Sequence, residues 1–404
     1  MSKKRVFPAP VMITTSAGVA SICAKLQHEP FVTIDTEFVR ERTYWPRLCL
    51  VQLGGVDDVA LIDTCVPGID LSPLAALLAE PDCVKVFHAA RQDLEIFLHL
   101  FGRLPVNVFD TQVAAMVAGF GEQVGYDNLV VSLTGQSIDK SHRFSDWAAR
   151  PLSKAQIAYA SADVTHLRVI YEMLLHQLEE QGRLAWVKDE LSALADERVF
   201  RPDVQKLWKK LKPRTHNRKV LAILREIVAW REGAAQQEDV PRQRIIRDES
   251  LLEIAAVHPH TIAQLIRIRG VTAEFAEGPL GRALLAAVQQ GEQCPEEARP
   301  ELPSRRKGDG PRAPAGVLAL LKVLLTVRSE EGKVASRLIA SAEELERLVQ
   351  GEQDLPVLTG WRARLFGREA QALLRGETVL CVEKGQLRII ERGAHAPMNM
   401  GQKG

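Results

Sequence analysis

The sequence predicts an α/β domain followed by an almost entirely helical region. Four short runs rich in β-branched residues, at 31–38, 48–54, 59–63 and 84–88, are bounded by Gly, Pro or Asp and predict strands. From residue 90 onward the apolar residues recur every three or four positions, which is the spacing of amphipathic helices. Strands followed by helices are typical of an α/β sheet domain, which we expect to cover residues 1–200.

Turn and cap signals separate the predicted elements. The second and third strands are expected to form a hairpin that turns at Gly54-Gly55. The segment RQDLEIFLHLFG carries apolar residues on one helical face and ends at Gly102. Further helices are predicted at about 110–119, 126–134 and 153–181, and Ser153 is the expected N-cap of the last one.

Two copies of one helical module are predicted beyond Pro202. Val240 and Val334, 94 positions apart, open two segments whose apolar residues coincide. Between them, residues 294–316 contain five prolines and three glycines and predict a linker. The expected domains after residue 200 are a first helical domain at 201–293 with a basic connector at 204–225, the linker at 294–316, a second helical domain at 317–385 and a tail at 386–404.

Composition argues against several classes of protein. The 404 residues are 46% hydrophobic and 25% charged, with a net charge of +1, as in an ordinary globular protein. Six scattered cysteines form no CxxC pair, which disfavours a zinc site or a disulfide framework and favours a reducing compartment. No apolar run approaches the roughly 20 residues of a membrane helix, and the first residues lack the apolar core of a signal peptide. We therefore expect a cytoplasmic protein without a membrane partner.

Acidic residues interrupt segments that otherwise read as buried. Asp35 and Glu37 lie two apart in the first predicted strand, so they face the same side and raise each other's pKa. Asp93 follows the strand at 84–88, and Tyr159 and Asp163 lie one turn apart on one helix. Mg²⁺ and Mn²⁺ prefer oxygen ligands, and two such ions would neutralise the acids and clamp a phosphoryl displacement.

Each of these signals also has a structural explanation. A D-x-E pattern is common in strands, and Asp93 alone is favoured by the dipole at a helix start. Tyr159 and Asp163 would suit an ordinary amphipathic helix edge. Their occurrence together, each beside apolar sequence, favours a two-metal site at the carboxyl edge of the sheet.

Successive blocks of the sequence resemble those of the ribonuclease D family. The blocks are FVTIDTEFVRERTYWPRLCLVQL, VFHAARQDLEIF, DTQVAAM, GYDNLV, DKSHRFSDWAARPLS and YASADVTHL. This family belongs to the DEDD 3′→5′ exonucleases, in the branch with a tyrosine in the third motif. The repeated helical module is similar to the HRDC domain, and its second copy departs further from that pattern. The resemblance covers nearly the whole chain and implies a ribonuclease H-like three-layer α/β/α domain with a mixed sheet.

The resemblance also implies a role for each acid and for the tyrosine. Asp35 would bridge two divalent ions, Glu37 and Asp163 would complete the site of the nucleophile-side ion, and Asp93 would hold the second ion, partly through water. Tyr159 matches the motif tyrosine. Because a free tyrosine has a pKa of about 10, we expect it to position the attacking water rather than to deprotonate it. The implied substrate is RNA, namely tRNA precursors with 3′ extensions.

Further substrate contacts are predicted in a polar loop and beside the acids. The loop DKSHRFSDWAARPLS offers candidates for phosphate contact and base stacking, namely Lys140, Arg143, Trp147 and Arg150. Alternatively, Trp147 packs on the core and Arg150 pairs with Asp146. Thr36 is expected to point to the opposite face from the metal acids, and its backbone is a candidate to line the terminal nucleotide.

The stretch 204–225 carries eight Lys or Arg residues and no Asp or Glu. A solvated helix face is one explanation, and a track for nucleic acid with Trp208 as a stacking residue is the other. Its position between the sheet domain and the first helical module favours the track.

Together with the resemblance, these observations predict a metal-dependent exoribonuclease that releases nucleoside 5′-monophosphates from RNA 3′ ends, and the resemblance implies that it trims tRNA precursors. A DNA 3′→5′ exonuclease with the same motifs is one alternative, because these motifs do not distinguish RNA from DNA. A non-catalytic nucleic-acid-binding adaptor is another, although all five site residues are intact. The expected cofactors are two Mg²⁺ or Mn²⁺ ions, and the expected state is a monomer without an obligatory protein partner.

Overall fold

The computed structural model describes residues 7–139, 141–302 and 313–392. The chain divides into two compact units, and each unit combines segments that are far apart in the sequence. The first unit comprises Met1–Phe109, Asp139–Arg168 and Ser192–Arg306, and the second comprises Asp110–Ile138, Val169–Leu191 and Lys307–Gly404. This division differs from the domains predicted from the sequence, because segments within the first 200 residues belong to the same unit as the C-terminal helices.

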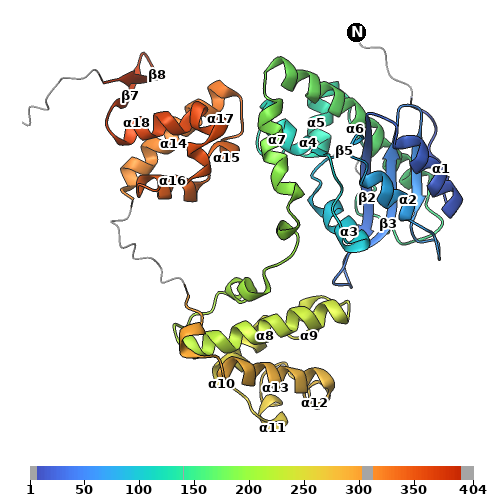
Figure 1. The fold of residues 1–404 in the computed structure, drawn as a ribbon, viewed down its shortest axis with the longest axis vertical. Helices are drawn as coiled ribbons and strands as arrows, with labels where there is room; N and C mark the ends of the chain where they lie inside the picture. Colours follow the sequence, from blue (N-terminus) through green and yellow to red (C-terminus); the bar gives the residue numbers. More distant parts are fainter. Residues whose placement is uncertain (1–6, 140, 303–312, 393–404) are drawn as a thin grey trace, which may run out of the picture. The chain divides into compact units, whose positions relative to one another are not determined.

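Within the described residues, six strands form one mixed sheet in the order β1-β4-β3-β2-β5-β6 (Figure 1). The strands are β1 (Val11–Ile13), β2 (Phe31–Val39), β3 (Arg47–Gly54), β4 (Val59–Asp63), β5 (Val84–Phe87) and β6 (Val108–Asp110). Strand β2 is antiparallel to β3 and parallel to β5, and β3 and β4 form the predicted hairpin. The four predicted strands are therefore confirmed. The sequence patterns missed β1 and β6, because three residues are too few to show a period.

Helices cover both faces of the sheet. One face packs on α1 (Ser16–Leu26), α2 (Ser72–Leu78) and α3 (Arg91–Phe101), in a core that includes Val32 and Ile34. The other face contributes Leu50 and Leu61 to a smaller core. There they pack with Ala160 of α6 (Lys154–Glu180). The predicted three-layer α/β/α arrangement is confirmed.

Helix α6 is attached to the sheet at a close approach. The hydroxyl of Thr33 on β2 donates to the carbonyl of Val164 at 2.8 Å. A Cβ atom at Gly54 would lie 2.3 Å from that hydroxyl and 3.1 Å from the Val164 carbonyl, so only glycine fits at this point of β3. The helix begins after Ser153, as predicted, because the Ser153 hydroxyl accepts from the backbone N–H of Gln156 at 3.2 Å.

The first helical module belongs to the same compact unit as the sheet. It contains the 3₁₀ segment η3 (Val204–Leu211), α8 (Arg218–Gln237), α9 (Arg242–Ile245), α10 (Asp248–Val257), α11 (Ile262–Leu265), α12 (Ala273–Glu277) and α13 (Pro279–Glu292). Tyr44, in the loop after β2, is buried in the core of this module. The Tyr44 hydroxyl hydrogen-bonds Glu232, and the backbone N–H groups of Tyr44 and Trp45 donate to Asp239 at 3.1 and 3.0 Å.

The second compact unit combines three parts of the chain. Its helices are α4 (Thr111–Ala118), α5 (Tyr126–Thr134), α7 (Leu184–Ser192), α14 (Ala315–Gly332), α15 (Ser336–Ile339), α16 (Ala342–Val349), α17 (Gly360–Arg362) and α18 (Arg368–Leu374), together with the end of α6. The rings of Trp186 and Trp361 stack with centroids 4.7 Å apart. The backbone N–H of Ala335 donates to the carbonyl of Met116 at 3.1 Å.

Further short helical segments complete the chain. They are η1 (Ala193–Ala195), η2 (Glu197–Val199), η4 (Glu296–Ala298), η5 (Pro356–Leu358) and the π-helical segment η6 (Ala363–Gly367).

The two helical modules repeat the same local structure. The four-residue helices α9 and α15 begin at Arg242 and Ser336, which are 94 positions apart, and each is followed by a longer helix. Three apolar residues of the first module align with three of the second at the same offset, and all six side chains are buried. They are Ile245, Leu251 and Ile254 in the first module, and Ile339, Leu345 and Leu348 in the second. The predicted repeat is confirmed at these positions.

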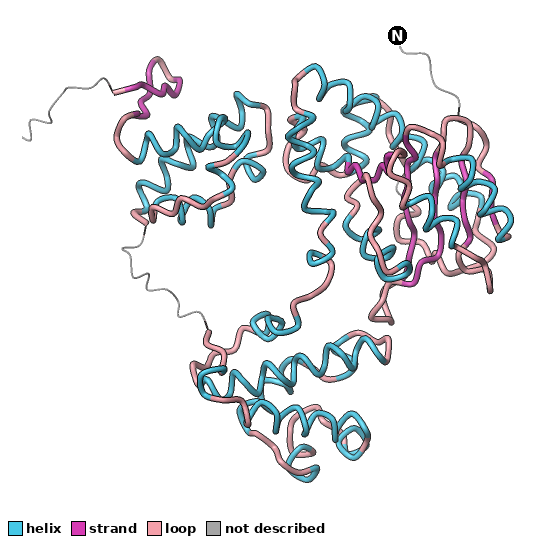
Figure 2. The backbone as a smooth tube through the Cα atoms, viewed as in Figure 1, coloured by secondary structure: helices cyan, strands magenta, loops and turns pink. Residues whose placement is uncertain are grey.

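The C-terminal segment corrects one prediction. Strands β7 (Thr378–Glu383) and β8 (Gln386–Glu391) form an antiparallel hairpin across the predicted boundary at residue 385 (Figure 2). The predicted tail therefore begins with a strand, because β-branched and aliphatic residues on both sides of Lys384-Gly385 allow a hairpin turn. Among the described residues, no helix combines the length and the apolar character needed to span a membrane.

Candidate active site

Strand β2 presents Asp35 and Glu37 on the face that α6 covers. Residues alternate between the faces of a strand, so these acids share their face with Thr33, whereas Val32 and Ile34 enter the opposite core. The register between β2 and β3 shifts after Glu37, which pairs with Leu50, whereas Phe38 pairs with Leu48. This β-bulge leaves Cys49 without a partner of its own and lies beside the acid that ends the D-x-E pattern.

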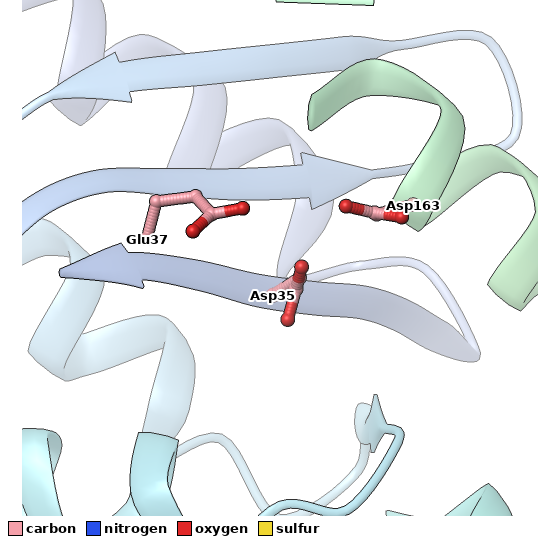
Figure 3. A group of neighbouring side chains, drawn as sticks. All are labelled: Asp35, Glu37 and Asp163. Atoms are coloured by element: carbon pink, nitrogen blue, oxygen red, sulfur yellow. The ribbon is translucent and has the colours of Figure 1, made fainter. Parts of the chain in front are cut away.

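Helix α6 brings a third carboxylate to this face. One ligand oxygen each of Asp35, Glu37 and Asp163 lies within 4.8 Å of the others. Figure 3 shows the carboxyl groups of Glu37 and Asp163 turned toward each other, with Asp35 beside the gap between them. Asp163 is buried, and the other two are half-buried. The predicted convergence of these three acids is therefore present in the structure.

Burial raises the pKa of every member of this cluster, and neighbouring charges add to the effect at Asp35 and Glu37. Burial, with the charge of Asp163, raises the pKa of Asp35 well above its usual range. Burial, followed by the charges of Asp35, Asp163 and Asp93, raises the pKa of Glu37 to about 10. Burial raises the pKa of Asp163 to about 7. Such shifts are typical of functional sites, and a bound cation would favour the ionised form of these carboxylates.

Tyr159 lies one turn before Asp163 and hydrogen-bonds its carboxylate. Burial and then the charges of Asp163, Glu37 and Asp35 raise the pKa of the Tyr159 hydroxyl above its ordinary value. The phenol therefore keeps its proton at neutral pH and acts as a donor. Its ring lies 5.9 Å from that of Trp147, which packs against it.

Asp93 stands apart from the three-acid cluster. It lies in the first turn of α3, is 6% exposed, and accepts a hydrogen bond from the hydroxyl of Thr36. Its charge contributes to the raised pKa of Glu37, so it is near the cluster. Thr36 does face away from Asp35 and Glu37, as predicted, but its side chain contacts the fourth acid, which the sequence did not indicate.

The polar loop contributes a cation and an exposed aromatic ring. The charge of Arg143 opposes the raised pKa values of Glu37 and Tyr159, so this exposed guanidinium lies near both groups. Its guanidinium carbon lies 5.5 Å from the ring centre of Phe144, and Phe144 is 91% exposed. Lys140, another candidate, lies outside the described residues. Phe144 was missed because nothing in its sequence neighbourhood distinguishes an exposed ring from a buried one.

Two predicted stacking residues are buried, and Arg150 has a different partner from the one that the sequence offered. Trp147 is 2% exposed and packs in the core beside Ala160, so it does not offer a stacking surface. Arg150 pairs with Asp63 at 2.7 Å rather than with Asp146, and it also donates to the carbonyl of Cys49 at 2.7 Å. Trp208 is 1% exposed in the core of the first helical module, and its indole N–H donates to the carbonyl of Gln205 at 3.0 Å. The two rings serve the fold, as the alternative interpretation of Trp147 expected, and Arg150 joins the polar loop to β3 and β4.

The donor set fits divalent cations. Three carboxylates that are costly to ionise without a cation offer the oxygen ligands that Mg²⁺ and Mn²⁺ prefer. Directly across from Asp35 on β3 is Gln52, which is fully buried. Neither polar atom of its carboxamide has a hydrogen-bond partner among the described residues. A buried carboxamide without hydrogen-bond partners is costly to the fold, and it adds an unsatisfied donor and acceptor to the acidic face.

Comparisons with known proteins agree with the fold. A family model described as 3'-5' exonuclease matches residues 10–179, and the HRDC domain model matches residues 220–288. The fold and the acids thus define a 3′→5′ exonuclease with an HRDC module.

Relatives that match nearly the whole chain identify the family. A ribonuclease D of Gluconacetobacter diazotrophicus is 59% identical over 95% of this chain and 97% of its own, and one of Granulibacter bethesdensis is 55% identical over 96% and 98%. The crystal structure of Escherichia coli RNase D, described as an exoribonuclease involved in structured RNA processing, is 33% identical. It matches 91% of this chain and 98% of its own with a TM-score of 0.77. The chain belongs to the ribonuclease D family of 3′→5′ exoribonucleases.

Proposed function

We propose that this exoribonuclease uses two divalent ions, Mg²⁺ or Mn²⁺, to release nucleoside 5′-monophosphates from RNA 3′ ends. The observation that carries the proposal is the cluster of Asp35, Glu37 and Asp163, whose ligand oxygens lie within 4.8 Å of one another and whose pKa values are all raised. All three side chains come from one chain, so the cluster needs no second subunit. This fits a monomeric enzyme.

The acids divide between the two ions. Asp35, Glu37 and Asp163 would hold one ion, and Asp93, with Asp35, would hold the other. Bound ions of this kind acidify a water molecule and stabilise charge on the attacking and leaving oxygens of a phosphodiester. Tyr159 keeps its proton, donates to Asp163, and so orients that carboxylate and the water beside it. General-base action by Tyr159 is disfavoured, because its pKa is raised rather than lowered.

Arg143 and Phe144 are proposed to hold the 3′ end of the RNA. Arg143 supplies a cation near Glu37 and Tyr159, where the scissile phosphate would lie. Phe144 supplies the stacking surface that Trp147 does not, because 91% of it is exposed. Stacking on an aromatic ring tolerates any base, as trimming of varied 3′ extensions requires.

A row of exposed cations is proposed to bind the body of the RNA. Lys209, Lys210, Lys212 and Arg214 are exposed, and none pairs with a carboxylate in the part of the chain that the structure describes. Lys210 also lines a groove of about 410 Å³, together with Arg40 and Tyr44 from the loop after β2. These cations would contact several phosphates of a bound RNA, and one of them lines the groove next to the end of β2. The arrangement favours a folded substrate such as a tRNA precursor.

The test compares one 5′-labelled RNA with a 3′ extension and its DNA analogue, with Mg²⁺, Mn²⁺ or EDTA. We expect the RNA to shorten one nucleotide at a time with either metal, the DNA to be cut much more slowly, and EDTA to stop the reaction. The control is Asp35→Asn, which should lose at least about 10³-fold in rate, corresponding to about 4 kcal/mol of transition-state stabilisation. Faster cleavage of DNA would favour the DNA exonuclease, and RNA binding without cleavage would favour the adaptor.

A further inference from the structure

Thr36 is placed between the catalytic acids in sequence but on the other side of the strand. Asp35 and Glu37 face α6, whereas the Thr36 side chain faces the layer that contains α3. Thr36 and Asp93 are both 6% exposed, and the Thr36 hydroxyl donates to Oδ1 of Asp93. One three-residue segment of β2 therefore reaches acids on both sides of the strand.

The contact belongs to a short series of contacts between β2 and α3. Strand β2 runs parallel to β5, and β5 leads into α3 within a few residues, so the start of α3 lies beside the carboxyl half of β2. Arg40, four residues after Thr36, donates to both carboxylate oxygens of Glu95 at 3.0 and 3.1 Å. The Glu95 pair is exposed, whereas the Asp93 contact is buried and next to the acidic cluster.

The contact places the Thr36 hydroxyl on a carboxylate that lies near the three-acid cluster. The charge of Asp93 contributes to the raised pKa of Glu37, so the Asp93 carboxylate is close to that cluster. A hydroxyl that donates to a carboxylate restricts the orientation of the carboxylate oxygens. The Thr36 hydroxyl is therefore in place to set the direction in which Asp93 presents its oxygens.

We propose that Thr36 is a positioning residue, whose hydroxyl holds the Asp93 carboxylate in the orientation from which it binds a divalent ion. The inference rests on the proposed two-ion function and deepens it. Residues that orient metal ligands typically change metal affinity or activity by about 10–100-fold when they are removed. Thr36 would thus control the second ion while Asp35 and Glu37, its neighbours in sequence, hold the first.

The experiment uses the full-length protein and two substitutions at one position. Thr36→Val removes the hydroxyl and keeps the shape, whereas Thr36→Ser keeps the hydroxyl and loses a methyl group. Mn²⁺ binding is titrated by electron paramagnetic resonance without RNA, and kcat and KM are measured over a range of Mn²⁺ concentrations. For Thr36→Val we expect the weaker Mn²⁺ ion to bind about 10–100-fold less tightly, with kcat reduced at low Mn²⁺ and KM for RNA within about twofold of wild type. Thr36→Ser should resemble the wild type in both measurements.

Matched controls separate positioning from packing. Thr134→Val removes a part-buried hydroxyl that donates to the carbonyl of Val130 at 2.7 Å, in the second compact unit, and should leave Mn²⁺ binding unchanged. In an Asp93→Asn background, Thr36→Val should cause no further loss, because the two residues act as a unit. If Thr36→Val does not fold, Thr36→Ala replaces it in the same titration.

Several outcomes would overturn the assignment. If Thr36→Val binds two Mn²⁺ ions as the wild type does, or if Thr36→Ser is as defective as Thr36→Val, the hydroxyl does not position Asp93. An added loss in the Asp93→Asn background has the same meaning. These results leave the proposed function standing, whereas a wild-type protein that binds no Mn²⁺ and cuts no RNA would remove both.

Discussion

At the scale of single residues, the unfavourable ionisation of three clustered acids explains why they would bind a divalent cation. Asp35, Glu37 and Asp163 are grouped in surroundings where ionisation is unfavourable, as their raised pKa values indicate. Proteins tolerate such groups where a ligand or ion compensates the charge. The stability of the metal-free protein should therefore depend on pH and on divalent ions together.

The first prediction concerns this linkage. The pKa of Glu37 is raised from an ordinary value of 4.5 to about 10, so its contribution to stability is full below the unfolded pKa and is lost as the pH rises toward 10. Asp163, raised to about 7, acts in the same direction. We expect the metal-free Tm to fall between pH 6 and pH 8.5 and added Mn²⁺ to raise the Tm more at pH 8.5. Calorimetry checks this, and equal Mn²⁺ effects at both pH values would contradict it.

Tyr159→Phe tests the role of the phenol. The change removes one donor to Asp163 and keeps the ring that packs beside Trp147. We expect kcat to fall by roughly 10²–10⁴, as for a positioned group in proton transfer, with little change in RNA affinity. Single-turnover rates and equilibrium binding of RNA to the Mn²⁺-free protein measure the two effects. Loss of binding with unchanged single-turnover chemistry would assign Tyr159 to substrate affinity instead.

Phe144→Ala tests the proposed stacking surface. Base–aromatic stacking contributes about 1–3 kcal/mol per base, so KM for a short RNA should rise by roughly 10-fold or more. Because the side chain is 91% exposed, the Tm should not change. Phe144→Trp serves as the control and should retain the wild-type KM. A KM that is unchanged in Phe144→Ala would show that this ring does not contact the substrate.

At the scale of elements, the bulge in β3 links the sheet to the polar loop. Arg150 donates to both carboxylate oxygens of Asp63 and to the carbonyl of Cys49, which is the unpaired residue of the bulge. The carbonyl of Trp147 also accepts from Arg150, at 2.7 Å. A single guanidinium therefore connects the end of β4, the bulge beside Glu37 and the loop that carries Arg143.

Arg150→Met is predicted to destabilise the protein and to impair catalysis. Although burial raises the pKa of Asp63, the hydrogen bonds from Arg150 and from the Cys65 backbone lower it overall. Removing Arg150 leaves that carboxylate buried without its cation, with only the hydrogen bond from the Cys65 backbone, which costs about 3 kcal/mol. Denaturant unfolding measures the loss. Arg150→Lys is the comparison and should recover only part of it, because an ammonium lacks the two-pronged geometry.

The pH dependence of this pair has the opposite sign to that of the acidic cluster. The lowered pKa of Asp63 means that its stabilising contribution is present above its unfolded pKa and is lost as the pH falls through the folded value. The difference in free energy of unfolding between wild type and Arg150→Met should therefore disappear in acid. An advantage that persists below pH 3 would show that packing, and not the ion pair, stabilises the loop.

At the scale of the whole molecule, the first compact unit contains both the catalytic acids and the cations that are proposed to bind RNA. The loop after β2 begins three residues beyond Glu37, the end of the D-x-E segment, and inserts Tyr44 into the core of the first helical module. The buried carboxylate of Glu232 accepts from Tyr44 and from Arg242. The exposed cations at 209–214 thus belong to the same compact unit as the acids.

Neutralising the row tests this arrangement. A fourfold variant replaces each cation of the row with glutamine: Lys209→Gln, Lys210→Gln, Lys212→Gln and Arg214→Gln. We expect a higher KM on a structured RNA and an almost unchanged KM on a di- or trinucleotide. Each lost phosphate contact flattens the salt dependence of binding by about 0.7 log units per log unit of salt for a single strand, so four contacts amount to about 3. Binding titrations from 50 to 300 mM salt measure the slope. The control is Lys154→Gln, a single exposed cation at the start of α6. An unchanged slope in the fourfold variant would exclude the row from RNA binding.

Local rules account for what the sequence by itself determined. Alternation along β2 put Asp35 and Glu37 on one face, and helical spacing put Tyr159 beside Asp163, so three acids and the phenol were predictable before the fold was known. The same periodicities predicted the four central strands and the repeat of the helical module. These features depend on residues that are close in sequence.

Contacts between distant segments were decided only by the tertiary structure. Thr36 meets Asp93 57 positions later, and Arg150 meets Asp63 87 positions earlier, and neither pairing follows from a local period. Trp147 and Phe144 are three residues apart in one loop, yet one ring is buried and the other exposed, because only the packed helix α6 determines which ring it covers. Local spacing sets the direction of a side chain from its own backbone, whereas its partner depends on which other segment the fold brings there.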